Sequence, residues 1–588
     1  MYSTLGLLVL TCGPVLVAFI VACILLRFAE KDASWLSFLT CVAGVAIAVS
    51  VVAVMPYDVW QALSAKDHHS HSGGSLLRNT WAATYWTTAL LSYLLCPILM
   101  EFEASGDFTV AARLRTSLRR NAVFYGVYAL IMVLLLIILV ARGEVHGDLQ
   151  SWCIAASNAW GLFVLTVLMG FGLVAVPRHF WSLSNPGLLL QDLYRNAVVK
   201  DETRLSRLFE LQDAVAQARA ELAAHVQLED EGPTAATQRR AFATVSQMTD
   251  RCECLHMELS GARMPVRDKG IGGISQSPSA TLALHPPPSL ARFAEVHRTL
   301  KAAALEARRA SCCFDSHIQR CIFFEDLEQG DHRAAVSMLG VRRATMPSQF
   351  RFFGSNNLRQ SLLSFWLRHI RARALLGLGH ASCILSAIVV LGQLTLFADG
   401  WHLSLLSLFF RQDYGPCLTQ AFCLVPLAYM AYTAYFSIFR LKISGWYGLY
   451  GNHSTDTGSL LWCASILARL AAPLCYHFLL LIRVNGTTFQ AFMGQMNMVP
   501  VLGASFNQVF PCLIALLCCC NVFNVYSRFL QFFTLGVMEF EFGEGGDGDD
   551  PLSDGKQLVD QERRRRAEEC DIELNGRAPF FATAPPAG

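Results

Sequence analysis

The segment Trp35–Val54, WLSFLTCVAGVAIAVSVVAV, sets the fold class, because it is apolar throughout and contains no charged residue. About 20 consecutive apolar residues are what a helix needs to cross the hydrocarbon core of a bilayer. Runs of the same kind recur at Leu5–Leu26, Ala122–Val140, Leu375–Phe397 and Thr419–Phe439. The sequence therefore predicts an all-α, polytopic membrane protein.

Composition supports this fold class. Of 588 residues, 53% are hydrophobic and 16% are charged, whereas soluble chains average about 25% charged residues. The formal net charge of +2 lacks the basic excess that is typical of nucleic-acid-binding proteins. Cysteines such as Cys518, Cys519 and Cys520 lie inside an apolar run, where cysteine packs as a small apolar side chain. We therefore expect the lipid bilayer, and no nucleic acid, as a partner.

The hydrophobic pattern predicts nine transmembrane helices, of which five precede a long polar insert and four follow it. They lie at approximately 5–26, 35–55, 80–100, 121–141, 153–176, 374–397, 416–439, 457–482 and 509–535. Lys and Arg concentrate in the cytoplasmic loops of membrane proteins. Here they concentrate in alternate loops, as at Arg119, Arg120 and the Arg563–Arg566 run. This bias predicts an extracellular or lumenal N-terminus and a cytosolic C-terminus.

Four domains follow from the predicted spans: a first bundle at 1–181, a cytosolic insert at 182–372, a second bundle at 373–537 and a tail at 538–588. The tail combines an acidic block with an arginine run and few large apolar residues, a composition that is typical of disorder. We therefore predict a disordered, charged cytosolic tail.

The insert carries the pattern of a helical hairpin. Apolar residues repeat with the alternating spacing of a coiled-coil seam at Leu208, Leu211, Val215, Ala218 and Leu222. A second helical pattern covers about 290–328, and the segment at 268–289 between them is rich in Gly and Pro, which break helices. We predict two helices joined by a flexible linker, with partner proteins bound through this insert.

Arg469 is the strongest candidate for an intramembrane polar site, because an arginine at the bilayer centre costs at least about 2.5 kcal/mol. It could bind an anionic ligand, or it could pair with an acid or with a backbone carbonyl freed near Pro473. His477 and Asn158 also lie at membrane depth, where interhelical hydrogen bonds are their ordinary role. Asp58, at the outer end of the second span, could face water or pair with a cation inside the bundle.

The sequence lacks the motifs of common enzyme classes, among them the phosphate-binding glycine loop, the zinc-protease helix and the nucleophile elbow. His68, His69 and His71 lie close together, but no carboxylate or thiol pattern completes a metal site. We expect no catalytic residue, cofactor or metal. The sequon at Asn485 falls on a predicted outer loop and is a candidate N-glycosylation site.

Several short motifs, in both membrane halves and in the tail, together resemble those of a known family. They are Pro56-Tyr57-Asp58-Val59, Tyr85-Trp86-Thr87, Asn158-Ala159-Trp160-Gly161-Leu162-Phe163, Val176-Pro177-Arg178 with Trp181, Arg469-Leu470 with Pro473-Leu474-Cys475 and Phe478, and Ser553-Asp554-Gly555-Lys556-Gln557-Leu558. Together they resemble the limb-region-1-like membrane protein family, most closely its domain-containing protein 2 branch. The resemblance implies nine spans with a coiled-coil-bearing cytosolic loop. It supplies no established active-site residue. Tyr57 and His477 depart from the family pattern.

The resemblance also suggests function, because this branch is connected with G-protein-coupled receptor signalling. Our leading hypothesis is a non-enzymatic, receptor-associated scaffold or regulator in the plasma membrane or an endolysosomal membrane. A transporter, or a transport accessory protein, with a polar path near Arg469 is the alternative. An endocytic receptor is the third possibility, suggested by other branches of the family.

Overall fold

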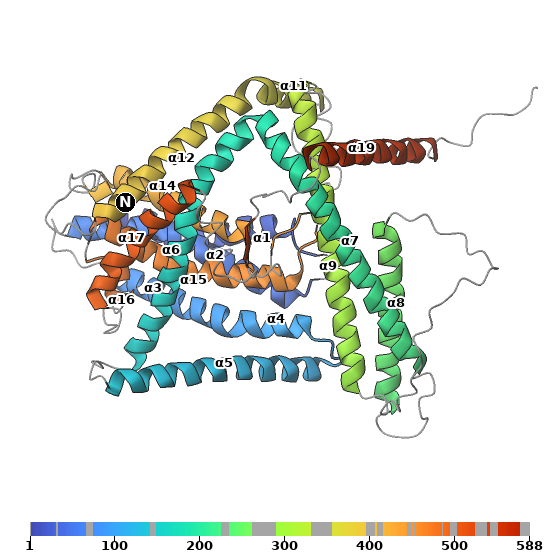
Figure 1. Cartoon of the computed structure of the whole chain (residues 1–588). Helices are drawn as coiled ribbons and strands as arrows, with labels where there is room; N and C mark the ends of the chain where they lie inside the picture. The colour runs from blue at the N-terminus through green and yellow to red at the C-terminus, as the bar shows by residue number, and fades with distance from the viewer. Residues whose placement is uncertain are drawn as a thin grey trace, which may run out of the picture. The chain divides into compact units, whose positions relative to one another are not determined.

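The computed structural model describes residues 2–30, 33–65, 74–141, 149–224, 235–260, 290–330, 356–395, 406–407, 415–443, 448–451, 453–484, 486–493, 503–523, 538–540 and 551–576. Nearly all of them are helical (Figure 1). Two short strands, β1 (Leu441–Ile443) and β2 (Met538–Phe540), pair antiparallel.

The chain forms two compact units. Unit 1 comprises Met1–His179, Leu208–Arg309 and Leu378–Phe542, and unit 2 comprises Phe180–Arg207, Ala310–Gly377 and Gly543–Gly588. Four helices contribute to both units: α6 (Leu149–Ser184), α7 (Pro186–Ala224), α9 (Leu290–Glu328) and α12 (Arg371–Leu394).

The other helices of unit 1 are α1 (Tyr2–Leu25), α2 (Trp35–Ala65), α3 (Gly74–Ala89), the π-helix η1 (Leu90–Leu95), α4 (Cys96–Ala104), α5 (Val110–Ala141), α8 (Ala235–Ser260), α14 (Pro416–Arg440), α15 (Thr457–Ile482), α16 (Thr488–Met493) and α17 (Gly503–Val522). The helix α12 (Arg371–Leu394) lies mainly in unit 1. Unit 2 adds α11 (Asn356–Phe365), the π-helix η3 (Trp366–Ile370) and α19 (Pro551–Gly576).

Six helices of the described residues are long and apolar enough to cross a membrane. They are Trp35–Ser64, Leu76–Ala104, Trp160–Ser184, Ser361–Leu394, Pro416–Arg440 and Thr457–Ile482, and each coincides with a predicted span. The predicted spans at 5–26 and 509–535 overlap shorter apolar helices, Gly13–Leu25 and Leu513–Val522. The predicted span at 121–141 lies within α5. The count of nine spans remains a prediction.

The helix α15 forms much of the core of unit 1, because almost all of its side chains are buried. It begins after Asp456, whose carboxylate caps the helix by accepting the Ser459 N–H at 3.0 Å. Small residues bring α2 close to it: a Cβ added at Gly44 would lie 3.1 Å from Ala464 Cβ. Close backbone approach at small residues is a common way for membrane helices to pack.

The insert contains three long helices, α7, α8 and α9. Two of them, α7 and α9, cover the predicted pair, and α8 was not predicted. The predicted seam residues Leu211 and Val215 are buried with Val245 of α8 and with Phe293 and Leu300 of α9. The seam is therefore covered by helices of its own chain. Coiled-coil geometry remains a prediction, and the predicted linker at 268–289 lies outside the described residues.

The prediction of a disordered tail is wrong for 551–576, which form α19. Three apolar residues in its first three turns, Leu552, Leu558 and Val559, pack in unit 2 against Phe314 and Ile318. Charge composition predicted disorder because it takes no account of the partners that the charged side chains find in the folded chain. In the folded chain, arginines of α19 meet carboxylates of α9.

Candidate functional site

The structure places the predicted polar residues at three separate positions in unit 1, rather than in one site. Asp58 is 1% exposed and accepts three hydrogen bonds. Its Oδ1 accepts the Thr488 N–H at 2.9 Å, and its Oδ2 accepts the Phe489 N–H at 2.7 Å and the Trp81 Nε1–H at 3.0 Å. Asp58 is therefore buried rather than exposed to water, and its partners among the described residues are N–H groups.

Asp58 ties three helices together at the end of α2. The N–H groups of Thr488 and Phe489 begin α16, where a carboxylate satisfies donors that the helix leaves unpaired. The Trp81 ring, on α3, packs edge-on against Phe489 with ring centroids 5.0 Å apart. The adjoining predicted glycosylation residue, Asn485, lies outside the described residues.

His477 forms an interhelical hydrogen bond. Its Nε2 lies 2.7 Å from the amide nitrogen of Gln393 on α12. Because an amide nitrogen only donates, the imidazole nitrogen accepts here. Both side chains are buried, so this pair joins α15 to α12.

Pro473 lies where α15 meets α6. A Cβ added at Gly161 would lie 2.6 Å from Pro473 Cγ, so the two helices approach closely at a glycine. Two of the motifs quoted above, one from each membrane half, therefore meet in space. Asn158 lies one turn before Gly161 in α6, but its side chain is outside the described part of the structure.

Arg469 lies near the middle of α15 and contacts η1. Its guanidinium donates to the Ser92 carbonyl, which also accepts the Ser465 hydroxyl at 3.2 Å. The guanidinium carbon lies 4.3 Å from the centre of the Tyr93 ring, a cation–π geometry. The predicted partners, an acid or a carbonyl near Pro473, are not the partner that the structure shows.

The local sequence explains why the Ser92 carbonyl is available. In η1 the Cys96 N–H bonds to the Leu91 carbonyl, a π-type hydrogen bond that skips Ser92. In the same pattern the Ser92 carbonyl would accept a hydrogen bond from the N–H of residue 97. That residue is Pro97, which has no N–H. The carbonyl therefore needs a donor from elsewhere, and Arg469 and Ser465 supply it.

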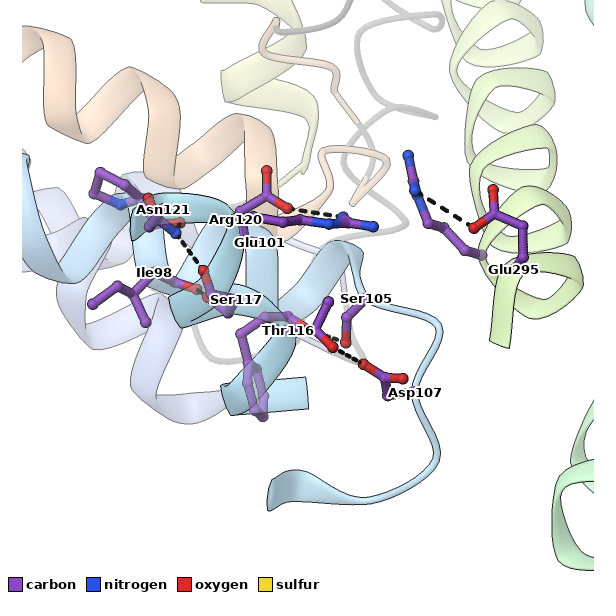
Figure 2. Close-up of polar contacts among 12 residues, drawn as sticks. Ile98, Glu101, Ser105, Asp107, Thr116, Ser117, Arg120, Asn121 and Glu295 are labelled. Atoms are coloured by element: carbon purple, nitrogen blue, oxygen red, sulfur yellow. Dashed lines mark hydrogen bonds and ion pairs between the residues drawn. The ribbon is translucent and has the colours of Figure 1, made fainter. Parts of the chain in front are cut away.

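The loop between α4 and α5 forms a hydrogen-bonded corner (Figure 2). Thr116 donates its hydroxyl to Asp107 at 2.6 Å, and Ser117 donates to the Ile98 carbonyl at 2.6 Å. Arg120 and Glu101 form an ion pair of 3.0 Å. These bonds fix the geometry of a predicted cytosolic loop.

The insert helix α9 packs on this corner. His297 Nδ1 lies 2.8 Å from the Gly106 carbonyl, and Lys301 donates to the Glu103 carbonyl. A Cβ added at Gly106 would lie 1.9 Å from the Ala294 carbonyl oxygen, so a side chain at 106 would push α9 away. Burial lowers the pKa of both His297 and Lys301 from their ordinary values.

Arg309 is the most enclosed cation of α9 among those in unit 1, at 4% exposure. It forms ion pairs with Asp456 and, at 2.7 Å, with Glu306, and it donates to the Ser459 hydroxyl at 3.0 Å. Burial alone would lower the pKa of Arg309, but the adjacent carboxylates of Asp456 and Glu306 raise it overall. The residue that caps α15 is thus also the counter-ion of a buried insert arginine.

The contacts between loops agree with the predicted topology, because each joins two segments that are predicted to lie on the same side of the membrane. At predicted cytosolic ends, Thr455 donates its N–H to the Phe28 carbonyl at 3.0 Å, and Arg308 pairs with Glu30 at 3.0 Å. At predicted outer ends, Arg483 donates to the Thr395 carbonyl at 2.7 Å. The contacts of Asp58 and Arg309 follow the same division. Each of these contacts joins segments that the charge pattern assigns to one side.

Comparison with known proteins now adds to these observations. Residues 7–526 match the model of the LMBR1-like membrane protein family. The chain belongs to this family. It is 26% identical over 506 residues to the human (Homo sapiens) G-protein coupled receptor-associated protein LMBRD2, covering 83% of this chain and 68% of that protein. The resemblance in the quoted motifs is confirmed.

Other relatives agree. The LMBR1 domain-containing protein 2 homolog of Drosophila melanogaster is 27% identical over 506 residues, covering 84% of this chain and 70% of that protein. The LMBR1 domain-containing protein 2 homolog A of Dictyostelium discoideum is 25% identical over 529 residues, covering 88% of this chain and 66% of that protein. No solved structure matches the chain.

Several residues of these contacts were missed by sequence reasoning. Asp456 carries the usual signal of a helix N-cap, since it directly precedes a span and Ser459 follows three residues later. That signal predicts the helix start but not the pairing with Arg309. Pro97 could have indicated a free carbonyl at Ser92 only if the π-helix had been known.

Proposed function

We propose that this LMBR1-like protein is a non-enzymatic, receptor-associated membrane protein whose insert binds signalling partners in the cytosol. The names of the homologues give the class of partner, G-protein coupled receptors. In this proposal nine helices cross the plasma membrane or an endolysosomal membrane. The N-terminus faces outward, and the insert and C-terminus face the cytosol.

The observation that carries the proposal is the attachment of α9 through Arg309. Asp456 both caps α15 and neutralises Arg309, so the position of the insert depends on the end of a membrane helix. Buried charge pairs hold their partners in place strongly, because breaking one leaves an unpaired buried charge at a cost of about 3–5 kcal/mol. Repacking of α15 by a neighbouring receptor would therefore displace α9.

The insert also offers an apolar surface outside the predicted spans. The side chain of Phe209, on the part of α7 that belongs to unit 1, is 64% exposed. Exposed aromatic and aliphatic side chains of this kind are typical anchors for protein partners. In the proposal this surface contacts a signalling protein.

Proximity labelling in cells tests the proposal. A labelling enzyme inserted near Ser275 of the full chain should enrich G-protein coupled receptors over a membrane-anchored control of the same enzyme. Arg309→Met should reduce this enrichment several-fold by releasing α9. Arg308→Ala is the matched control, because its pair with Glu30 is half-exposed and such pairs contribute at most about 1 kcal/mol. Equal receptor labelling by the parent and the membrane-anchored control would refute receptor association.

A further inference from the structure

The charge of Arg469 is not neutralised by any carboxylate among the described residues. Its hydrogen bond goes to the Ser92 carbonyl and its cation–π contact to Tyr93, both of which are uncharged. A cation at the bilayer centre is unfavourable by about 2.5–3.5 kcal/mol or more. An anion at this position would relieve that cost.

Two polar atoms beside this charge lack partners. Arg469 Nε and Ser92 Oγ are buried and make no hydrogen bond to other described residues. Ser92 is 0% exposed. Most buried polar side-chain atoms in proteins have a hydrogen-bond partner, either protein or ligand or water. Arg469 has no carboxylate partner among the described residues, and its own Nε and the adjacent Ser92 hydroxyl make no hydrogen bond there. This arrangement indicates a ligand that brings acceptor oxygens.

Arg469 has exposed apolar and aromatic neighbours on η1, within a predicted span. Arg469 is partly exposed near the middle of α15, and its neighbour Tyr93 is 38% exposed. Leu90 and Leu94, on the same π-helix, are also exposed. A ligand would reach the arginine from the hydrocarbon and would find apolar side chains beside it.

We propose that Arg469 binds the carboxylate of a long-chain fatty acid, whose alkyl chain lies along the exposed leucines of η1. Phospholipid headgroups lie at the interface, about 15 Å from the bilayer centre, and do not reach this depth. A fatty acid crosses the hydrocarbon in its protonated form. At Arg469 it loses its proton, which leaves to water at the membrane surface, and the resulting carboxylate forms with the guanidinium the paired, two-bond geometry that guanidinium favours.

Binding of palmitate to the purified full-length protein in detergent tests this inference. Native mass spectrometry should show a palmitate adduct, with hexadecanol and acetate binding at least tenfold more weakly. Hexadecanol keeps the chain without the charge, and acetate keeps the charge without the chain. Equal binding of hexadecanol would reduce the site to an apolar surface, and equal binding of acetate would make it a small-anion site. Either result, or no palmitate adduct, would overturn the proposal.

Variants localise the site. Arg469→Gln should abolish the adduct, and Arg469→Lys should weaken it while keeping some binding. Arg440→Gln, at the end of α14, is the control and should bind like the parent. If Arg469→Gln does not fold, Ser92→Ala provides the test, since the Ser92 hydroxyl has no partner to lose. This variant should melt like the parent yet bind palmitate several-fold more weakly. Parent-like binding by Arg469→Gln, or by a folded Ser92→Ala, would contradict the assignment.

Discussion

Arg469 of α15 donates a hydrogen bond to the Ser92 carbonyl, which Pro97 leaves without a donor in its own helix. Arg469→Leu should therefore lower the melting temperature of the detergent-solubilised protein, because the carbonyl loses a charged donor. Unmet buried polar groups cost about 1–3 kcal/mol. Pro97→Ala restores an N–H that can reach Ser92, so the double variant should melt above Arg469→Leu alone. If the changes in melting temperature caused by Arg469→Leu and Pro97→Ala simply add in the double variant, the Ser92 carbonyl does not couple the two residues.

Asp58 should be essential for the packing of α3 and α16 on α2. Asp58→Ala leaves two buried N–H groups, of Phe489 and Trp81, and the partly buried Thr488 N–H without an acceptor. This should destabilise the protein by at least about 2 kcal/mol, since each unmet buried group costs about 1–3 kcal/mol. Trp81→Phe removes one of these donors and should cost less. Gln61→Ala, one turn further along α2, is the control, since Gln61 Oε1 makes no hydrogen bond to described residues. Melting curves in detergent give the ranking, and a parent-like Asp58→Ala would contradict the assigned role.

Acidification should weaken the docking of α9 on the α4–α5 corner. Burial lowers the pKa of His297 below its ordinary value of 6.5, and the nearby charges of Lys301 and Arg113 act in the same direction. The undocked imidazole therefore binds a proton at a higher pH than the docked one, and docking loses stability as pH falls below about 6.5. Burial also lowers the pKa of Lys301 from its ordinary value.

The measurement is the melting temperature at about pH 7.5 and about pH 5.5. Stability should fall over this interval in the parent. His297→Gln keeps a donor for the Gly106 carbonyl but does not titrate, so its loss over the same interval should be smaller. An identical loss in both proteins would assign the pH dependence to other groups.

The tail helix should depend on Gly555, which belongs to one of the motifs quoted above. A Cβ at this position would lie 2.0 Å from the Tyr194 carbonyl oxygen. Gly555→Ala should therefore release α19 and expose the buried side chain of Val559, and trypsin should then cleave the Arg563–Arg566 run faster. Lys556→Ala, at the next and exposed position, is the control. Unchanged cleavage of Gly555→Ala would contradict the docking of α19 on α7.

The spans were predictable from sequence because hydrophobicity over about 20 residues is a local property. The assignment of loops to sides needs only the positions of Lys and Arg and stays a prediction. Asp58 and Arg469 were recognised as unusual, but their partners were not predicted. Those partners are backbone groups, Thr488 and Phe489 N–H and the Ser92 carbonyl, and every residue type carries such groups.

Two helices were missed or misjudged for a different reason. The helix α8 was missed although its apolar residues repeat at helical spacing and pack in the insert core: Ala241, Val245, Met248, Cys252, Leu255 and Leu259. The arginines of α19 suggested a solvated tail, yet Arg563 pairs with the buried acids Glu325 and Asp326. For α19 the stabilising carboxylates lie on α9, remote in sequence, so local composition carries no trace of them.

Accessibility of engineered tags tests whether the loop contacts sort by side of the membrane. We predict that a protease-cleavable tag near Ser275 of the insert is cut only from the cytosol. A tag near Asn485, before the α16 segment that Asp58 caps, should be cut only from outside the cell or from the organelle lumen. Cleavage of both tags from the same side would contradict the assignment of the Arg309 and Asp58 contacts to opposite ends of the spans, and with it the placement of the insert in the cytosol.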